Sequence, residues 1–320
     1  MITLIFLFGA ACAQQNTAYT DNFARMTMYP LSAAAYSNDP IKCAKIIDPD
    51  AKEVEQVTIY CGDENTCSGY TAVLPSKNVI VIGFRGSKTK KQALSIVAKT
   101  IATKRCRWKA DTGQVAKYFY DAFDGIWNST SSETRMGDNV IRLVKDYPSH
   151  DIWITGHSLG GALAALAASY IVESGIVPNG DKIRLVTFGQ PKVGDRNFAN
   201  LLNKRVKKIN RKWFFLKYQN FKIKYSFRVV HHHDLVVRIP LFFYTHQRTE
   251  VLTYFISFLN RRSHKHSNLC IQILYKKGMP KDYTAYERHA PAFGPSVLKI
   301  TYIISAETLA NMDIPDAREH

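Results

Sequence analysis

One seven-residue segment, 155–161, constrains the fold of this 320-residue chain more than any other. It reads Thr-Gly-His-Ser-Leu-Gly-Gly, with an apolar run before it and an Ala- and Leu-rich stretch over 162–174 after it. A Gly-x-Ser-x-Gly sequence between a strand and a helix predicts a sharp turn that exposes the hydroxyl of Ser158. Gly156 and Gly160 would let the strand and the helix approach closely. A chance match is the alternative, but both flanking patterns agree with the motif.

The chemistry of such a turn needs two further groups. A serine hydroxyl is a weak nucleophile unless a histidine takes its proton and a carboxylate orients that histidine. The backbone N–H of Leu159, directly after the serine, is an expected oxyanion donor at the start of the helix. In chain order the acid follows the serine and the histidine follows the acid. Asp195 and Asp234 both follow strand-like runs, and spacing alone does not choose between them.

Strand-like and helix-like segments alternate along the chain. Short apolar runs predict strands at Val79–Phe84, Ile152–Thr155, Ile183–Phe188 and Phe227–Val230, and helical patterns separate several of them. This alternation predicts an α/β fold, with a mostly parallel central sheet and helices on both faces. Because no repeat or Pro- or Ser-rich linker interrupts it, we expect one domain over 14–320.

The N-terminus and the cysteines indicate a secreted protein. Residues 1–13 combine a short apolar run with Ala-Cys-Ala and are predicted to be a signal peptide, with a buried strand or a membrane anchor as the alternatives. Cys61 and Cys67 are placed to form a short-loop disulfide in an oxidising compartment. Asn128 begins a glycosylation triplet, which would place it in an exposed loop.

The formal net charge of +17 suggests nucleic acid or an anionic surface as a partner. Three segments, 88–109, 204–224 and 261–281, carry eight, nine and six basic residues and no Asp or Glu, so the rest of the chain is net acidic. No nucleic-acid motif accompanies them. We therefore expect no nucleic-acid partner, and contact with a lipid or membrane surface is possible.

Several motifs in order resemble the class 3 lipase family, the fungal-type triacylglycerol lipases, and in particular its secreted nematode branch. They extend over roughly residues 28 to 250 and include the segment 155–161. The others are Pro-Leu-Ser-Ala-Ala-Ala-Tyr at 30–36, Cys-Ser-Gly-Tyr at 67–70, Phe-Arg-Gly-Ser at 84–87, Tyr-Phe-Tyr-Asp-Ala-Phe at 118–123, Phe-Gly-Gln-Pro-Lys-Val-Gly-Asp at 188–195, His-Asp-Leu-Val-Val-Arg-Ile-Pro at 233–240 and Tyr-Thr-His at 244–246. The resemblance implies the α/β-hydrolase fold.

The resemblance also implies roles for individual residues. Ser158 is the nucleophile within an elbow formed by Gly156, His157 and Gly160, Asp234 is the acid, and Ser87 is the second oxyanion donor beside Leu159. Asp195 and His246 match positions outside the triad. The segment 313–320 resembles the stretch that leads into the family's histidine, so His320 is the preferred base and His289 the next candidate. An amphipathic pattern over 92–101 resembles the family's lid, with a fixed surface helix as the alternative.

The resulting prediction is a secreted triacylglycerol lipase-like ester hydrolase that uses an acyl-enzyme intermediate and acts on lipid or ester substrate at a lipid–water interface. An esterase for soluble esters and a non-catalytic lipid-binding descendant with an incomplete triad are the alternatives. No cofactor and no metal are expected, since the three adjacent histidines 231–233 would point to opposite faces of a strand. The segments 207–224 and 252–273 fit the family poorly and are interpreted as insertions or gene-model artefacts.

Overall fold

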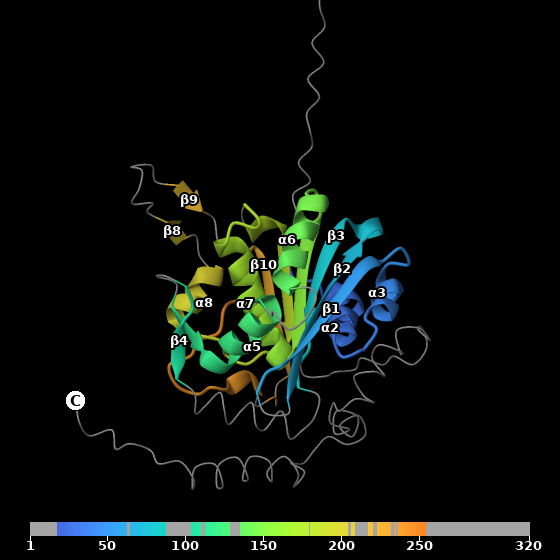
Figure 1. The fold of residues 1–320 in the computed structure, drawn as a ribbon. Helices are drawn as coiled ribbons and strands as arrows, with labels where there is room; N and C mark the ends of the chain where they lie inside the picture. Colours follow the sequence, from blue (N-terminus) through green and yellow to red (C-terminus); the bar gives the residue numbers. More distant parts are fainter. Residues whose placement is uncertain are drawn as a thin grey trace, which may run out of the picture.

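A central sheet of seven strands organises the computed structural model (Figure 1). The structure describes residues 18–62, 65–87, 104–109, 113–128, 135–178, 180–203, 206–208, 217–219, 223–231, 234 and 236–253. The strand order is β1-β2-β3-β6-β7-β10-β11. β1 and β2 pair antiparallel, as do β2 and β3, and every later neighbouring pair is parallel. The predicted mostly parallel sheet of an α/β-hydrolase fold is confirmed.

The helices and strands follow one another along the chain from α1 to β11. They are α1 (Asp21–Phe23), the π-helix η1 (Ala24–Met28), α2 (Tyr29–Ala34), α3 (Ile41–Ile47), β1 (Lys52–Tyr60), β2 (Thr66–Leu74), the 3-10 turn η2 (Pro75–Lys77), β3 (Val79–Phe84), β4 (Arg105–Arg107), β5 (Gln114–Ala116), α5 (Lys117–Asn128), α6 (Met136–Asp146), β6 (Asp151–His157), α7 (Leu159–Glu173), η3 (Gly180–Lys182), β7 (Ile183–Phe188), α8 (Arg196–Asn203), β8 (Val206–Lys208), β9 (Lys217–Gln219), β10 (Tyr225–His231), η4 (Val236–Arg238) and β11 (Glu250–Thr253).

The central strands are largely apolar because helices cover both faces of the sheet. All six residues of β3 are buried, and β6 and β7 are buried at nearly every position. Such continuous apolar runs are typical of parallel strands that are covered on both sides. The predicted strands Val79–Phe84 and Ile183–Phe188 coincide with β3 and β7, while β6 and β10 extend the predictions by one to two residues at their ends.

Two hydrophobic clusters lie on opposite faces of this sheet. α5, α7 and α8 pack over one face with Ile82, Ile154 and Leu185, whereas the N-terminal helices pack over the other with Val81 and Trp153. α7 is buried almost all round, as expected for a helix of Ala and Leu without a polar face. α5 is amphipathic and turns its six buried residues toward α7 and the sheet. These layers fix the strand ends that carry the site.

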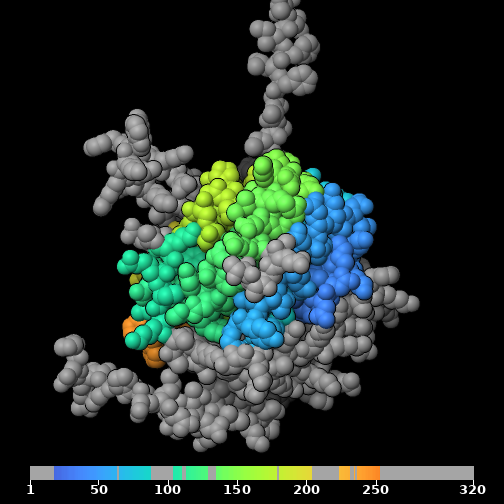
Figure 2. Space-filling model, in the orientation of Figure 1, coloured from blue at the N-terminus to red at the C-terminus, as the bar shows by residue number. Residues whose placement is uncertain are grey.

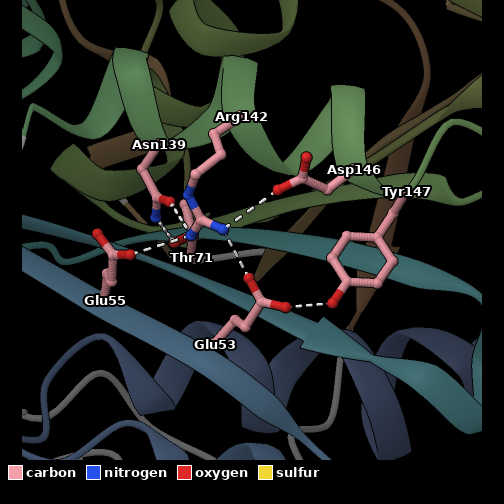
Figure 3. A network of polar contacts seen from close by, with 7 residues as sticks. All are labelled: Glu53, Glu55, Thr71, Asn139, Arg142, Asp146 and Tyr147. Carbon is pink, nitrogen blue, oxygen red and sulfur yellow. Dashed lines mark hydrogen bonds and ion pairs between the residues drawn. The ribbon is translucent and has the colours of Figure 1, made fainter.

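The β1 edge of the sheet is secured by a disulfide and by a polar network. Cys61 and Cys67 form the predicted disulfide between the ends of β1 and β2. In Figure 3, Arg142 of α6 reaches down to Glu53 and Glu55 of β1, and the Tyr147 hydroxyl also donates to Glu53. The shortest of these ion pairs joins Arg142 Nη1 to Glu53 Oε2 at 2.8 Å. The network therefore ties α6 to the first strand.

Several predictions fall partly or wholly outside the described residues. They are the signal peptide at 1–13, the lid at 92–101, and the candidate bases His320 and His289. Within the suspected insertion 207–224, β8 and β9 form a separate two-stranded sheet that projects from the body of the molecule (Figure 1). Within 252–273, the first two residues continue β11 beside β10. Among the described helices, none has the length and apolar character needed to cross a bilayer.

Candidate active site

Ser158 occupies the sharp turn between β6 and α7. Its backbone angles are φ 56° and ψ −125°, a conformation that residues with a side chain rarely adopt. Backbone hydrogen bonds hold this strained residue. Its N–H donates to the carbonyl of Phe188 at 2.9 Å, and its carbonyl accepts from Gly161 N–H at 2.9 Å. The serine is therefore presented at the N-terminus of a 15-residue helix, where backbone N–H groups and the helix dipole favour negative charge.

The turn depends on two glycines that allow backbone to pack directly on backbone. A Cβ atom at Gly156 would lie 2.2 Å from the carbonyl oxygen of Gly160. A Cβ atom at Gly160 would lie 2.2 Å from the carbonyl oxygen of Phe84, the last residue of β3. Neither neighbour is a flexible side chain, so any larger residue would force the strand and the helix apart. This packing brings β3, β6 and α7 together behind Ser158.

The segment that follows β3 lies directly against the turn. A Cβ atom at Gly86 would lie 2.5 Å from the carbonyl oxygen of His157 and 3.3 Å from the Cβ of Ser158. Ser87, the predicted second oxyanion donor, is the next residue and is half-buried. Arg85 anchors the segment from the other side, since its buried guanidinium donates to the hydroxyl of Thr66 at 2.8 Å. Residues 85–87, the predicted oxyanion segment, are thus held between β2 and the turn at Ser158.

Tyr36 connects residues 85–87 to the turn at Ser158, and the sequence did not reveal this contact. Its hydroxyl accepts a hydrogen bond from Gly86 N–H at 3.1 Å and lies 2.9 Å from Nδ1 of His157. Burial lowers the pKa of His157 to about 4, so the imidazole is uncharged at neutral pH. Tyr36 ends the predicted family motif at 30–36, but only the folded chain brings it within reach of residues 86 and 157.

Asp234 lies at the same edge of the sheet as Ser158, just beyond the end of β10. Its Oδ1 accepts from Val236 N–H at 2.9 Å. A Cβ atom at Gly189 would lie 2.9 Å from Asp234 Oδ2 and 3.7 Å from His157 Nε2. The carboxyl group is therefore close to the residue that precedes the nucleophile. Burial raises the pKa of Asp234 to about 6, against one favourable backbone hydrogen bond that lowers it.

The structure gives Asp195 and Asp234 different surroundings, although spacing in the sequence did not distinguish them. Asp195 Oδ1 accepts from Phe198 N–H at 2.9 Å, the geometry of a residue that caps the N-terminus of α8. A capping role accounts for its carboxylate. Asp234 caps no described helix of comparable length and lies beside the elbow instead. Of these two carboxylates, Asp195 is engaged at the start of α8, whereas Asp234 lies near His157, the neighbour of Ser158.

His246 supports the loop that carries Asp234. Its Nε2 lies 2.6 Å from the carbonyl of Val237, while its buried Nδ1 has no hydrogen-bond partner among the described residues. Burial first, and the charge of Arg228 second, lower the pKa of His246 to about 4. An uncharged imidazole that donates to backbone in this way fits a structural role. His320 and His289 lie outside the described residues.

Asn128 and Cys106 form none of the contacts described above. Asn128 is exposed at the end of α5, where its Nδ2 donates to Asp124 at 2.8 Å. Cys106 is a free, half-buried thiol. Within the described ranges, no group of three or more His, Cys, Asp or Glu side chains is arranged to hold a metal ion.

Comparison with known proteins gives the same family that the motifs suggested. Residues 81–244, more than half of the chain, match the family described as Lipase (class 3). The chain is similar to "Lipase ZK262.3" of Caenorhabditis elegans, at 32% identity over 73% of this chain and 58% of that protein. It is also similar to "Secreted mono- and diacylglycerol lipase 1" of Fusarium solani, at 24% identity over 73% and 64%. The chain thus spans less than two thirds of the length of these relatives.

Solved structures show the same fold at low sequence identity. A lipase from Rhizopus microsporus var. chinensis superposes with a TM-score of 0.57 at 20% identity, over 73% of this chain and 75% of that chain. The LIP2 lipase of Yarrowia lipolytica superposes with a TM-score of 0.55 at 21% identity, over 72% and 79%. With its strained serine turn, its parallel sheet and a match across more than half its length, the chain belongs to the class 3 lipase family.

Proposed function

We propose that this chain is a secreted serine ester hydrolase that acts on lipids at a lipid–water interface. One observation carries the proposal. Ser158 lies in a strained strand-to-helix turn with the oxyanion segment packed against it and a partly desolvated carboxyl group, Asp234, at the same edge of the sheet. With a histidine as base, this arrangement would supply the groups that nucleophilic attack on an ester requires. The family and the names of the relatives support lipid esters as the substrate class.

In the proposed reaction, Ser158 Oγ attacks the carbonyl carbon of the ester while a histidine takes the hydroxyl proton. We assign this base to His320, with His289 as the next candidate. Asp234 orients the imidazole and stabilises its charged form. The N–H groups of Ser87 and Leu159 bind the oxyanion of the tetrahedral intermediate, helped by the N-terminus of α7.

The intermediate then collapses with cleavage of the ester C–O bond. The leaving alcohol takes its proton from the imidazolium, and the acyl group stays on Ser158. Water attacks this acyl-enzyme with the same histidine as base, which releases the fatty acid and restores the serine hydroxyl. The proposed cycle uses no cofactor.

Secretion is supported by three features. The apolar segment at 1–13 ends in a small-residue cleavage pattern, and the Cys61–Cys67 disulfide suits an oxidising compartment. A relative is also named as a secreted lipase. Microsomal translation should therefore yield a processed chain that begins near residue 14, and an unprocessed chain would argue against secretion by this route.

The experiment that tests the activity is hydrolysis of short- and long-chain p-nitrophenyl esters by the full chain. Ser158→Ala should lower kcat by at least about 10⁴-fold, because removal of a triad serine leaves only oxyanion and binding effects. Comparison of His320→Ala with His289→Ala identifies the base, since only loss of the true base should approach the effect of Ser158→Ala. Turnover that persists in Ser158→Ala would exclude the proposed nucleophile. No turnover in the wild type would favour a lipid-binding descendant.

A further inference from the structure

Three consecutive large apolar side chains are exposed in the loop after Asp234. Leu241, Phe242 and Phe243 are 63%, 74% and 79% exposed. Single exposed apolar residues are common on protein surfaces, but a contiguous run of this size marks a site of contact with another apolar phase. We call residues 241–243 the apolar tip.

The exposure of the apolar tip is imposed by the fold, since both of its ends are hydrogen-bonded to the body. Before the tip, Lys192 N–H donates to the carbonyl of Ile239 at 2.8 Å. After it, Thr245 N–H donates to the carbonyl of Gly194 at 2.8 Å. The loop leaves the carboxyl end of β10, so it lies at the edge of the sheet that carries Ser158. In Figure 1 this orange segment runs below α5 to the side of β4, and its atoms remain visible at the lower left of Figure 2.

Three cationic side chains lie beside the apolar tip. The guanidinium of Arg105 lies over the ring of Phe243, 5.4 Å from its centroid. Arg105 and Arg196 line one shallow hollow of about 360 Å³ together with Phe243. Lys192 Nζ lies 3.5 Å from the carbonyl of Leu241. This arrangement places at least three positive charges at the base of the exposed rings.

No ion pair within the described part of the chain involves these cations. Arg105, Lys192, Arg196 and the exposed Arg238 form no ion pair with any carboxylate of the described residues. Asp195 lines the same hollow, and it already accepts a hydrogen bond from the backbone of α8. Apolar side chains that protrude beside cations with no ion pair among the described residues match the two layers of an anionic lipid surface, which are a charged headgroup plane and an acyl interior.

We propose that the apolar tip anchors this protein to anionic lipid–water interfaces, together with the cations Arg105, Lys192, Arg196 and Arg238. The proposal rests on the proposed function in one respect, since anchoring here would hold the edge that carries Ser158 at the lipid surface. Insertion of Leu241, Phe242 and Phe243 supplies affinity for any lipid surface, while Arg105, Lys192, Arg196 and Arg238 supply the preference for anionic headgroups.

The test measures partition of the full chain onto vesicles of phosphatidylcholine alone and of phosphatidylcholine mixed with phosphatidylglycerol. All proteins carry Ser158→Ala, so the assay needs no turnover and its outcome is independent of whether the chain hydrolyses esters. Changing Leu241, Phe242 and Phe243 together to Ser should lower partition at least about tenfold on both vesicle types. Ile141→Ser is the matched control, because Ile141 is 50% exposed on α6 and should have no effect.

A second pair of variants tests the charges. Arg196→Gln with Arg238→Gln should lower partition about fivefold per charge on the anionic vesicles and leave the neutral vesicles unchanged. Lys77→Gln is the control, because this exposed lysine lies in the turn before β3, at the opposite edge of the sheet. Circular dichroism and the melting temperature verify that each variant is folded.

Two results would overturn the proposal. The first is partition of the apolar-tip variant equal to that of Ile141→Ser. The second is a dimer of the unmodified chain in sedimentation equilibrium that the apolar-tip variant abolishes, without vesicle binding by either protein, which would assign the tip to a second copy of the chain.

Discussion

Ser158 and Asp234 lie at the same edge of the sheet, but the segments that carry them are held in different ways. Backbone packs on backbone around Ser158, because Gly156 and Gly160 leave no space behind the turn. Around Asp234, by contrast, the carboxyl group has one backbone hydrogen bond and an environment that raises its pKa to about 6. The serine side is thus fixed by close backbone packing, whereas the acid side carries a carboxyl group that burial partly desolvates.

Because of this difference, mutations on the two sides should affect kcat and stability differently. On the serine side, activity depends on the positions of uncharged groups. Loss of a contact there should therefore lower kcat without any change in the charge of the site. On the acid side, the buried carboxylate costs stability, and a charge partner would compensate that cost. Sites that give up stability for activity are expected to show opposite signs for the two measurements.

The largest effect on kcat should follow replacement of Asp234, the proposed acid. Asp234→Asn should lower kcat about 10⁴-fold, because an amide cannot hold the base in the correct tautomer or stabilise its charged form. Steady-state hydrolysis of a soluble p-nitrophenyl ester measures this. Asp195→Asn is the matched control, since Asp195 is a nearby carboxylate that caps α8. Equal losses in the two variants would mean that the loop after β10 does not supply the acid.

A smaller effect is expected on the serine side. Tyr36→Phe should lower kcat between about tenfold and about 10²-fold with little change in KM, because Gly86 loses its hydrogen-bond acceptor and the oxyanion segment shifts. Tyr70→Phe is the control, because it also removes a buried hydroxyl, which donates to the carbonyl of Leu31 at 2.7 Å. If both variants lose activity equally, the effect is one of general stability and Tyr36 has no positioning role.

Asp234 should also affect the free energy of unfolding. A carboxyl group whose pKa is raised on folding is destabilising when ionised, and this cost disappears as the pH falls through the folded pKa toward the unfolded one. Asp234→Asn should therefore raise the free energy of unfolding by on the order of 1 kcal/mol at pH 7. The gain should fade between about pH 6 and about pH 4. Urea denaturation at several pH values measures it, and a variant less stable than wild type at pH 7 would contradict the desolvated carboxylate.

The smallest effect is expected away from both sides of the site. Arg142→Ala breaks the exposed network of Figure 3 and should cost about 1 kcal/mol or less, because exposed ion pairs are screened by water and salt. The kcat should not change. A loss of activity here would show that the β1 edge communicates with the site, and the serine side could then no longer be regarded as self-contained.

Much of the central sheet could be predicted from the sequence, and the reason is burial. β3 and β7 are largely apolar because both faces are covered, so their limits are visible in the sequence. β1, β2 and β11 have no counterpart among the predicted strands. β1 is largely half-exposed and owes its conformation to pairing with β2, which no local pattern encodes.

The candidate site divides in the same way. The turn at Ser158 is encoded locally, since a glycine on each side of the serine is needed wherever a strand and a helix approach this closely. The choice between Asp195 and Asp234 is not local, because both follow strand ends and only the packing of α8 gives Asp195 another task. The apolar tip was likewise hidden, since a run of Leu and Phe in a sequence does not reveal whether it will be covered.

The sequence by itself determined the nucleophile turn, the buried strands and the family, because these depend on residues that are neighbours in the chain or on continuous apolar runs. Only the tertiary structure decided that Tyr36 bridges Gly86 and His157, that Asp234 lies beside the elbow, and that residues 241–243 remain exposed among cations. These features join residues tens to more than a hundred positions apart. Such contacts form only when the strands have paired and the helices have packed, so their energies leave no local pattern in the chain.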